Sequence, residues 1–179
     1  QILAQHALPA SETSLAEAVG HILTRRGWSV ATAESCTGGG IAAALTDVPG
    51  SSSYFEGGLV TYSNASKSTH LGVPLEILSA HGAVSEPTVL HMLDGALNTF
   101  GVDAAIAVTG IAGPGGATPG KPVGRVHIGV AAGSVREAAM FTFPGDRAAV
   151  RLRTVQTALR LLRDALLKTA GESPQNSRS

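Results

Sequence analysis

The stretch WSVATAESCTGGGIAAAL, residues 28–45, decides the fold of this chain. It opens with a β-prone run over residues 28–33, passes through a polar, glycine-rich turn over 34–40, and enters an apolar run over 41–45. A strand that feeds a turn of this kind and then a helix is the layout of many α/β active sites. The stretch therefore predicts an α/β domain with functional side chains at the carboxyl end of an early strand.

The rest of the chain alternates between helical and strand patterns. The other expected helices are residues 11–26, 65–71, 74–80, 85–100 and 146–170. The other expected strands are residues 57–63, 104–108, 125–131 and 137–143, and the glycine- and proline-rich residues 109–124 are expected to form a loop. Strands alternate with helices for two thirds of the chain and a hairpin follows, which predicts a three-layer α/β/α sandwich with a mixed sheet.

Length and composition fit one folded domain. The chain has 179 residues, 44% of them hydrophobic, and we expect a single domain over residues 1–170 with a disordered polar tail over 171–179. Lys plus Arg and Asp plus Glu both number 13, so no overall positive charge favours a nucleic acid as partner. No apolar run is long enough for a membrane span. Cys36 is the sole cysteine, which favours a reducing compartment, and we expect the cytoplasm.

Ser35 is the strongest candidate for chemistry. A serine at a strand-to-helix turn presents its hydroxyl at the edge of the sheet, close to backbone N–H groups that have no helical acceptor. Such donors stabilise an oxyanion, and Gly38 and Gly39 let a substrate approach the backbone closely. The alternative is that Ser35 or Thr37 merely caps the helix. Cys36 is either a competing nucleophile or a small buried side chain.

Lys67 is the candidate base for a serine nucleophile. If Asn64 caps the helix over 65–71, Lys67 is its third residue, where the helix dipole disfavours a positive charge. Burial would lower the pKa of Lys67 further. Tyr62, on the preceding expected strand, would reach the same pocket with its hydroxyl. The alternative is an exposed lysine and a half-buried tyrosine.

Two further features offer contacts for a substrate. The loop after the strand over 104–108 begins with Thr109 and Gly110 and continues to Gly113, and its backbone N–H groups suit a phosphate or a ring. Arg147 and Arg151 lie four residues apart on one face of the last expected helix. They either hold a substrate phosphate or make surface ion pairs. The histidines show no spacing typical of a metal site, so we expect neither metal nor cofactor.

Taken together, several blocks resemble the CinA C-terminal domain family over about residues 13–167. They are AESCTGG (33–39), PGSS (49–52), YFEGG (54–58), YSN (62–64) with Lys67, LGV (71–73), GAVSE (82–86), TGIAGP (109–114), KPVG (121–124), and GDR (145–147) with Arg151. Any one block is weak, but the whole set in this order is highly specific. In larger family members this domain follows a molybdopterin-binding-like domain, so the chain looks like the stand-alone form.

The resemblance implies an amidohydrolase that converts nicotinamide mononucleotide (NMN) to nicotinic acid mononucleotide and ammonia. It implies Ser35 as nucleophile, Lys67 as general base and Tyr62 as the partner of Lys67. The turn of Cys36, Thr37, Gly38 and Gly39 would supply oxyanion donors, and the loop of Thr109, Gly110 and Gly113 would contact the substrate. A non-catalytic nucleotide-binding or regulatory domain of the same fold is the alternative. The partners we expect are a pyridine mononucleotide and further copies of the chain in a homo-oligomer.

Overall fold

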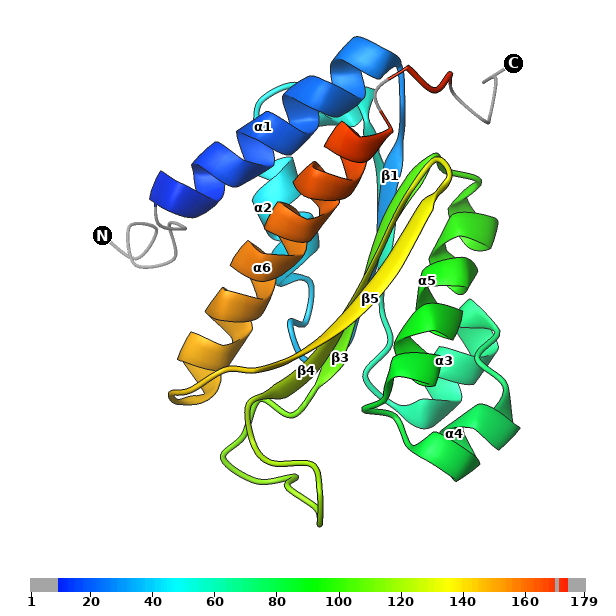
Figure 1. The fold of residues 1–179 in the computed structure, drawn as a ribbon, viewed down its shortest axis with the longest axis vertical. Coiled ribbons are helices and arrows are strands. Elements are labelled where there is room, and N and C mark those ends of the chain that lie inside the picture. The colour runs from blue at the N-terminus through cyan, green and yellow to red at the C-terminus, as the bar shows by residue number, and fades with distance from the viewer. Residues whose placement is uncertain (1–9, 170, 174–179) are drawn as a thin grey trace.

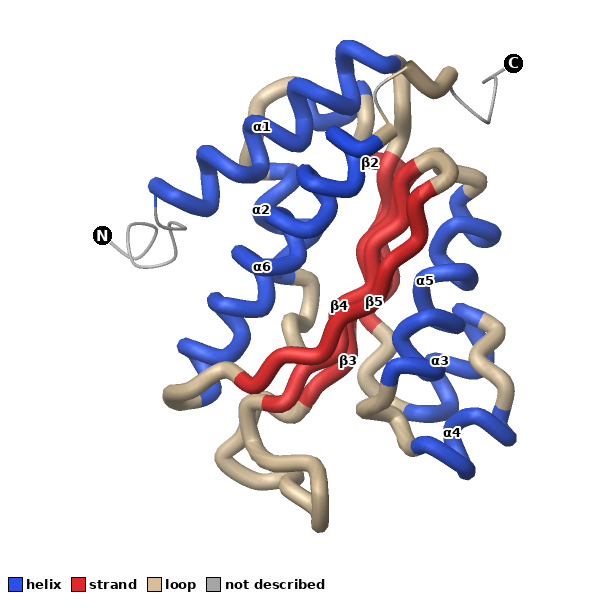
Figure 2. Tube along the Cα trace, viewed as in Figure 1, coloured by secondary structure: helices blue, strands red, loops and turns tan. Residues whose placement is uncertain are grey.

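The computed structural model describes residues 10–169 and 171–173, with side chains from residue 15 onward. One sheet lies between two layers of helices (Figures 1 and 2). One face is covered by α1 (Ala10–Arg26), α2 (Gly40–Thr46) and α6 (Arg147–Lys168). The other face is covered by α3 (Asn64–Leu71), α4 (Leu75–His81) and α5 (Glu86–Phe100). The three-layer α/β/α prediction is confirmed.

The sheet is mixed, as predicted. Its strands are β1 (Val30–Glu34), β2 (Phe55–Val60), β3 (Ala104–Gly110), β4 (Arg125–Ala132) and β5 (Val135–Thr142), and a short 3-10 helix, Ser51–Ser53, precedes β2. The order across the sheet is β2-β1-β3-β4-β5, with β1, β2 and β3 parallel and β4 and β5 antiparallel to their neighbours. The carboxyl ends of the three parallel strands therefore meet at one end of the sheet, where the loops that follow them carry the candidate residues.

Burial explains why β1 and β3 form the centre. All residues of β1 are buried, and so are Ala104 to Thr109 of β3, because helices cover both faces of the parallel part of the sheet. Val30 and Ile106 belong to the core cluster beneath α1, α2 and α6, whereas Ala33 and Ala107 belong to the cluster beneath α5. Side chains of opposite parity along β1 therefore face different helical layers.

Each strand differs from its expected bounds by a few residues, and the carboxyl ends of β2 and β3 matter because they move candidate residues. Strand β2 was expected over 57–63 but ends at Val60, because its parallel register with β1 ends at the pair Glu34 and Val60. Tyr62 therefore lies in a loop. Strand β3 was expected to end at residue 108 but continues through Thr109 and Gly110, because antiparallel pairing with β4 extends the ladder.

The caps of α3 and α6 decide where their side chains lie. Ser63, not Asn64, caps α3, since its hydroxyl accepts the N–H of Ser66 at 3.0 Å. The predicted Asn64 cap is wrong, and Lys67 becomes the fourth helical residue instead of the third. Helix α6 begins at Arg147 because Asp146 accepts the N–H of Ala149 at 2.9 Å. The residues of α6 predicted to face inward are all buried: Val150, Val155, Ala158, Leu159, Leu162 and Leu166.

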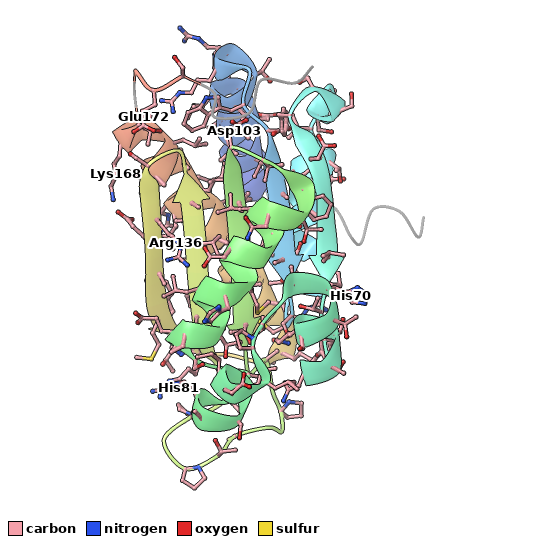
Figure 3. All side chains as sticks on the ribbon, turned by 90° about the vertical axis from the view of Figure 1, so that its right-hand side faces the viewer. His70, His81, Asp103, Arg136, Lys168 and Glu172 are labelled. Atoms are coloured by element: carbon pink, nitrogen blue, oxygen red, sulfur yellow. The ribbon has the colours of Figure 1, made fainter. Side chains whose placement is uncertain are left out.

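Different residues lie at the two ends of the sheet. At the amino end, labelled by Asp103 and Glu172 in Figure 3, Glu172 accepts hydrogen bonds from the backbone N–H and the hydroxyl of Ser134. Glu172 belongs to the predicted tail over residues 171–179. The structure describes residues 171–173 of this tail, and residues 174–179 lie outside the described residues. His81 marks the opposite end. Among the described helices, none has the length and apolar character that crossing a membrane requires.

Candidate active site

The turn after β1 presents Ser35 at the carboxyl end of the sheet. Ser35 is 8% exposed, and its carbonyl accepts the N–H of Gly38 at 3.0 Å. Gly38 and Gly39 have φ values of 61° and 94°. This left-handed region strongly favours glycine, so the two glycines are explained by the path of the chain from β1 into α2. Helix α2 begins at Gly40, five residues after Ser35.

Glu34 takes up the donors that sequence reasoning had assigned to the site. Its buried carboxylate accepts hydrogen bonds from the hydroxyl of Thr37 and from the backbone N–H groups of Gly39, Ile41 and Ala42. At the start of α2, the N–H groups of Ile41 and Ala42 therefore point to Glu34 and that of Gly40 to the carbonyl of Thr37, and not to the space beside Ser35. The alternative that Ser35 or Thr37 caps α2 is also wrong, since the N-cap residue is Gly39 and no side chain caps it from that position.

Two donors of the turn remain for a bound oxyanion. The N–H of Gly38 is bonded to Ser35 and that of Gly39 to Glu34. Within the described residues, the N–H groups of Cys36 and Thr37 have no acceptor. Of the four predicted oxyanion donors, Gly38 and Gly39 already have acceptors, and Cys36 and Thr37 remain as candidates.

Lys67 reaches Ser35 from α3. Its Nζ lies 3.1 Å from Ser35 Oγ and donates to the carbonyl of Thr61 at 2.6 Å. The Lys67 residue is 1% exposed, and burial lowers its pKa below 10.5. The helix dipole lowers the pKa of Lys67 less than the sequence analysis predicted. Lys67 is the fourth residue of α3 and not the third, and the dipole effect fades within the first turn. Burial is the leading cause of the lowered pKa.

Thr61 holds Lys67 in place through its backbone. Its N–H donates to the carbonyl of Glu34 at 2.8 Å, and its carbonyl accepts from Lys67. Thr61 thereby fixes the amine relative to the last residue of β1, next to Ser35. Sequence reasoning missed Thr61, because a backbone carbonyl leaves no signal in the residue types. It also missed Glu34, although an acidic residue at the end of an apolar strand was a visible signal.

Cys36 is a poor nucleophile in this setting. It is buried and packs in the core cluster beneath α6, and burial raises the pKa of its thiol to about 11. A thiol becomes a strong nucleophile only as the thiolate. The structure therefore supports the reading of Cys36 as a small buried side chain beside the turn.

Tyr62 contacts Arg147 and not Lys67. Its side chain is on the surface, with the residue 58% exposed, and its hydroxyl accepts from Arg147 Nη2 at 2.8 Å. Arg147 also donates to the carbonyl of Gly113 at 3.0 Å. No hydrogen bond joins Tyr62 to Lys67 within the described residues, so the predicted partnership of these two is corrected. Tyr62, Arg147 and Gly113 instead link the loop after β2, the start of α6 and the β3–β4 loop.

Arg151 lies one turn along α6 and contacts the serine turn. Its Nη2 donates to the carbonyl of Thr37 at 2.9 Å, and a Cβ at Gly38 would lie 3.4 Å from the same nitrogen. Both Arg147 and Arg151 are exposed, and neither forms an ion pair with any described residue. The surface ion-pair alternative is therefore not what the structure shows. Each guanidinium keeps further N–H donors for an anion.

Thr109 and Gly110 are held by packing at the end of β3. The hydroxyl of Thr109 donates to the carbonyl of Ala83 at 2.8 Å. A Cβ at Gly110 would lie 2.9 Å from the carbonyl of Arg125 and 3.1 Å from the sulfur of Cys36, so a larger residue does not fit there. Continuing the register of Ala33 with Ala107 by two residues places Thr109 beside Ser35. Thr109 therefore lines the same end of the sheet.

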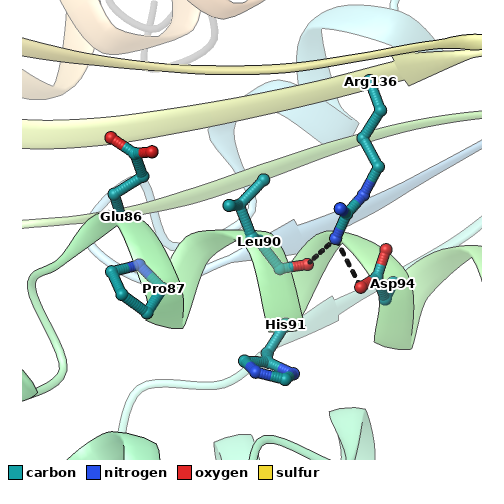
Figure 4. Close-up of a pocket in the computed structure, with 6 residues that line it drawn as sticks. All are labelled: Glu86, Pro87, Leu90, His91, Asp94 and Arg136. Atoms are coloured by element: carbon teal, nitrogen blue, oxygen red, sulfur yellow. Dashed lines mark hydrogen bonds and ion pairs between the residues drawn. The ribbon is translucent and has the colours of Figure 1, made fainter. Parts of the chain in front are cut away.

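A separate groove lies away from these residues. About 630 Å³ of space between α5 and β5 is lined by Glu86, Pro87, Leu90, His91, Asp94 and Arg136 (Figure 4). Arg136 is ion-paired with Asp94 and donates to the carbonyl of Leu90, so its charge is already compensated. None of the predicted site residues lines this groove. Among the described residues, no cluster of three or more His, Cys, Asp or Glu could hold a metal ion.

Comparison with known proteins gives one consistent relationship. The profile of the CinA C-terminal domain matches residues 12–166. A CinA-like protein of Parasynechococcus marenigrum is 52% identical over 167 residues, which is 92% of this chain and 40% of that protein. A putative competence-damage inducible protein of Symbiobacterium thermophilum is 50% identical over 168 residues, or 88% of this chain and 39% of that protein. The chain thus spans about two fifths of these relatives.

Solved structures agree with the fold. The competence/damage inducible protein CihA from Agrobacterium tumefaciens superposes with a TM-score of 0.84 at 44% identity, covering 90% of this chain and 98% of that one. A CinA superfamily protein from Klebsiella pneumoniae gives a TM-score of 0.84 at 38% identity, covering 88% and 98%. The likeness extends over nearly all of both solved chains.

Proposed function

The chain belongs to the CinA C-terminal domain family, and from that premise we propose that it hydrolyses the carboxamide of NMN, with Ser35 as nucleophile and Lys67 as general base. The observation that carries the proposal is the 3.1 Å contact between Lys67 Nζ and Ser35 Oγ in a buried site. A hydroxyl becomes an effective nucleophile when a base within hydrogen-bond reach takes its proton. The products would be nicotinic acid mononucleotide and ammonia.

The neutral form of Lys67 fits this role geometrically. A neutral amine has two N–H bonds and one lone pair. One N–H donates to the Thr61 carbonyl at 2.6 Å, which turns the lone pair toward the Ser35 hydroxyl. When Lys67 is protonated, the same 3.1 Å contact runs in the opposite direction, from the ammonium to the Ser35 oxygen.

The reaction would proceed in two halves. Ser35 Oγ attacks the carboxamide carbon while its proton passes to Lys67, and the N–H groups of Cys36 and Thr37 hold the negative oxygen. The C–N bond then breaks, Lys67 returns the proton to the leaving nitrogen, and ammonia departs. Water attacks the resulting ester of Ser35 and gives up a proton to Lys67. The bond between the acyl carbon and Ser35 Oγ then breaks, Lys67 returns its proton to Oγ, and the carboxylic acid leaves.

Arg147 and Arg151 support a mononucleotide as substrate. Two exposed guanidinium groups that have no ion-pair partner in the described part of the chain lie four residues apart, and one of them contacts the serine turn itself. Guanidinium groups bind phosphate through charge-assisted hydrogen bonds. The choice of NMN among phosphorylated carboxamides rests on the family resemblance.

The test is ammonia release from NMN by the purified chain, with nicotinamide, glutamine and asparagine as comparison substrates and Ser35→Ala as the control protein. We expect NMN to be the preferred substrate and the Ser35→Ala protein to be inactive. Tight binding of NMN without ammonia release would favour the alternative of a non-catalytic nucleotide-binding domain. Equal release from glutamine would contradict the nucleotide specificity.

A further inference from the structure

Glu34 concentrates an unusual number of donors on one buried carboxylate. The residue is 1% exposed. Oε2 accepts from Thr37 Oγ1 at 2.6 Å, from Gly39 N at 3.0 Å and from Ile41 N at 3.1 Å, and Oε1 accepts from Ala42 N at 2.8 Å. A hydrogen bond to a charged group is stronger than one between neutral groups. Glu34 is therefore the strongest single restraint on the segment between β1 and α2.

We propose that Glu34 is a positioning residue for hydrolysis at Ser35, an inference that rests on the proposed function. Glu34 precedes Ser35 directly. One of its donors, the hydroxyl of Thr37, belongs to the turn that holds Ser35 and Cys36, and its three backbone donors follow that turn. Thr37 is restrained through its hydroxyl by Glu34 and through its carbonyl by Arg151. Its N–H, one of the two proposed oxyanion donors, is consequently fixed in direction.

Glu34 also decides which donors remain available. Because it accepts the N–H groups of Gly39, Ile41 and Ala42, these groups do not compete for the substrate oxygen. Among the described residues, the N–H groups of Cys36 and Thr37 are left without an acceptor. Preorganised donors accelerate acyl transfer because they need no reorganisation when negative charge develops. The arrangement thus links a buried acid, which never touches the substrate, to the stabilisation of the transition state.

A purely structural role predicts a different outcome. If Glu34 only anchored the start of α2, its loss would lower stability, and kcat would follow the fraction of folded protein. A positioning role predicts a fall in kcat in protein that remains folded, with little change in KM, since the interaction lost is made in the transition state alone.

Glu34→Gln is the informative variant. The amide oxygen can replace Oε2, but the amide NH2 then faces the N–H of Ala42, so one donor loses its acceptor and two donors oppose each other. Thr37→Val is a second, milder variant that removes one donor to Glu34 and keeps the backbone N–H of residue 37. Asp103→Asn is the matched control. Asp103 is also a buried carboxylate, accepts the backbone N–H of Ser29 at 2.9 Å, and lies at the amino end of the sheet (Figure 3).

The experiment measures Tm, kcat and KM for NMN in these three variants and the wild-type chain. We expect Glu34→Gln to lose about 10- to 100-fold in kcat, somewhat less than removal of an oxyanion donor itself, with KM within about twofold. Thr37→Val should lose about tenfold or less in the same direction. Asp103→Asn should lower Tm about as much as Glu34→Gln and leave kcat unchanged.

Two results would overturn the inference and leave the proposed function standing. The first is a kcat for Glu34→Gln equal to that of the wild type. The second is a decrease in kcat for Glu34→Gln that is no larger than the decrease in kcat for Asp103→Asn. If the wild-type chain releases no ammonia from NMN, the proposed function fails by itself. The rate at which a fluorophosphonate probe labels Ser35 then decides: labelling of Glu34→Gln as fast as the wild type contradicts the positioning role, and slower labelling at an unchanged Tm supports it.

Discussion

Lys67 Nζ lies 3.1 Å from Ser35 Oγ, across 32 residues of sequence, and both side chains are buried at the carboxyl end of β1. Burial removes water from the amine and so favours its neutral form, which can accept a proton. Ser35 in turn has its proposed base within hydrogen-bond reach. In the proposed reaction the two residues act together, and the first two predictions below test them separately.

Replacing Ser35 by Ala should reduce kcat by about 10³-fold or more, as removal of a covalent nucleophile does, while the fold persists. Cys36→Ala should keep most of the activity, because burial raises the pKa of the thiol to about 11 and leaves little thiolate at neutral pH. Ammonia release measures the activity of each variant, and Tm shows whether the variant remains folded. The opposite pattern, an active Ser35→Ala and an inactive Cys36→Ala, would mean a thiol amidase.

The rate of NMN hydrolysis should rise with pH through one ionisation below 10.5 and then level off. Burial lowers the pKa of Lys67, so the neutral base forms at a lower pH than in a free lysine, and its fraction grows as pH rises. A pH profile of kcat/KM measures this ionisation.

Variants of Lys67 provide the control for that profile. Lys67→Arg should be nearly as inactive as Lys67→Met, since a guanidinium keeps its proton over the whole accessible range. Methionine has a similar length and keeps the buried site filled. Substantial activity in Lys67→Arg would show that position 67 needs only a positive charge.

Loss of Arg147 should mainly raise KM for NMN, because binding of the phosphate is equal in the ground and transition states. Loss of Arg151 should raise KM and also lower kcat, because Arg151 restrains the carbonyl of Thr37. Tyr62→Phe should resemble Arg147→Ala, since its hydroxyl contacts that guanidinium. Nicotinamide riboside, which lacks the phosphate, should react much more weakly than NMN. Arg160→Ala, an exposed arginine further along α6, is the matched control. Kinetics like those of the control in both Arg147→Ala and Arg151→Ala would exclude a phosphate site there.

Ser63→Ala should destabilise the protein by about 1 kcal/mol, the usual cost of losing an N-cap. Asn64→Ala should stay within about 0.5 kcal/mol of the wild type, because Asn64 is the first residue inside α3 and Ser63 makes the capping bond. Urea unfolding of both variants gives the comparison. A larger loss in Asn64→Ala than in Ser63→Ala would contradict the cap assignment.

Activity should be independent of a bound metal, since the proposed reaction uses only the Ser35 hydroxyl, the Lys67 amine and backbone donors. Dialysis of the active chain against EDTA should leave kcat unchanged. A loss that added zinc or manganese restores would require a different mechanism.

The sequence by itself determined the order of the elements and the class of fold. Hydrophobic periodicity within each segment is local information, and it placed α5, α6 and the buried strand β3 close to their observed bounds. The strand–turn–helix pattern over residues 28–45 likewise identified Ser35 as the residue at the turn. Local pattern made Lys67 only a candidate base, and the family resemblance supplied the prediction of that role.

Only the tertiary structure decided how the site residues are paired. The partner of Tyr62 is Arg147, 85 residues away. The N–H groups of Ile41 and Ala42 in the first turn of α2 point to Glu34, and Ser63 instead of Asn64 caps α3. These outcomes depend on where each strand ladder ends and on which acceptor each backbone donor reaches in the folded chain. Residue types along the sequence show which groups can bond, but packing of distant segments selects the bonds that form.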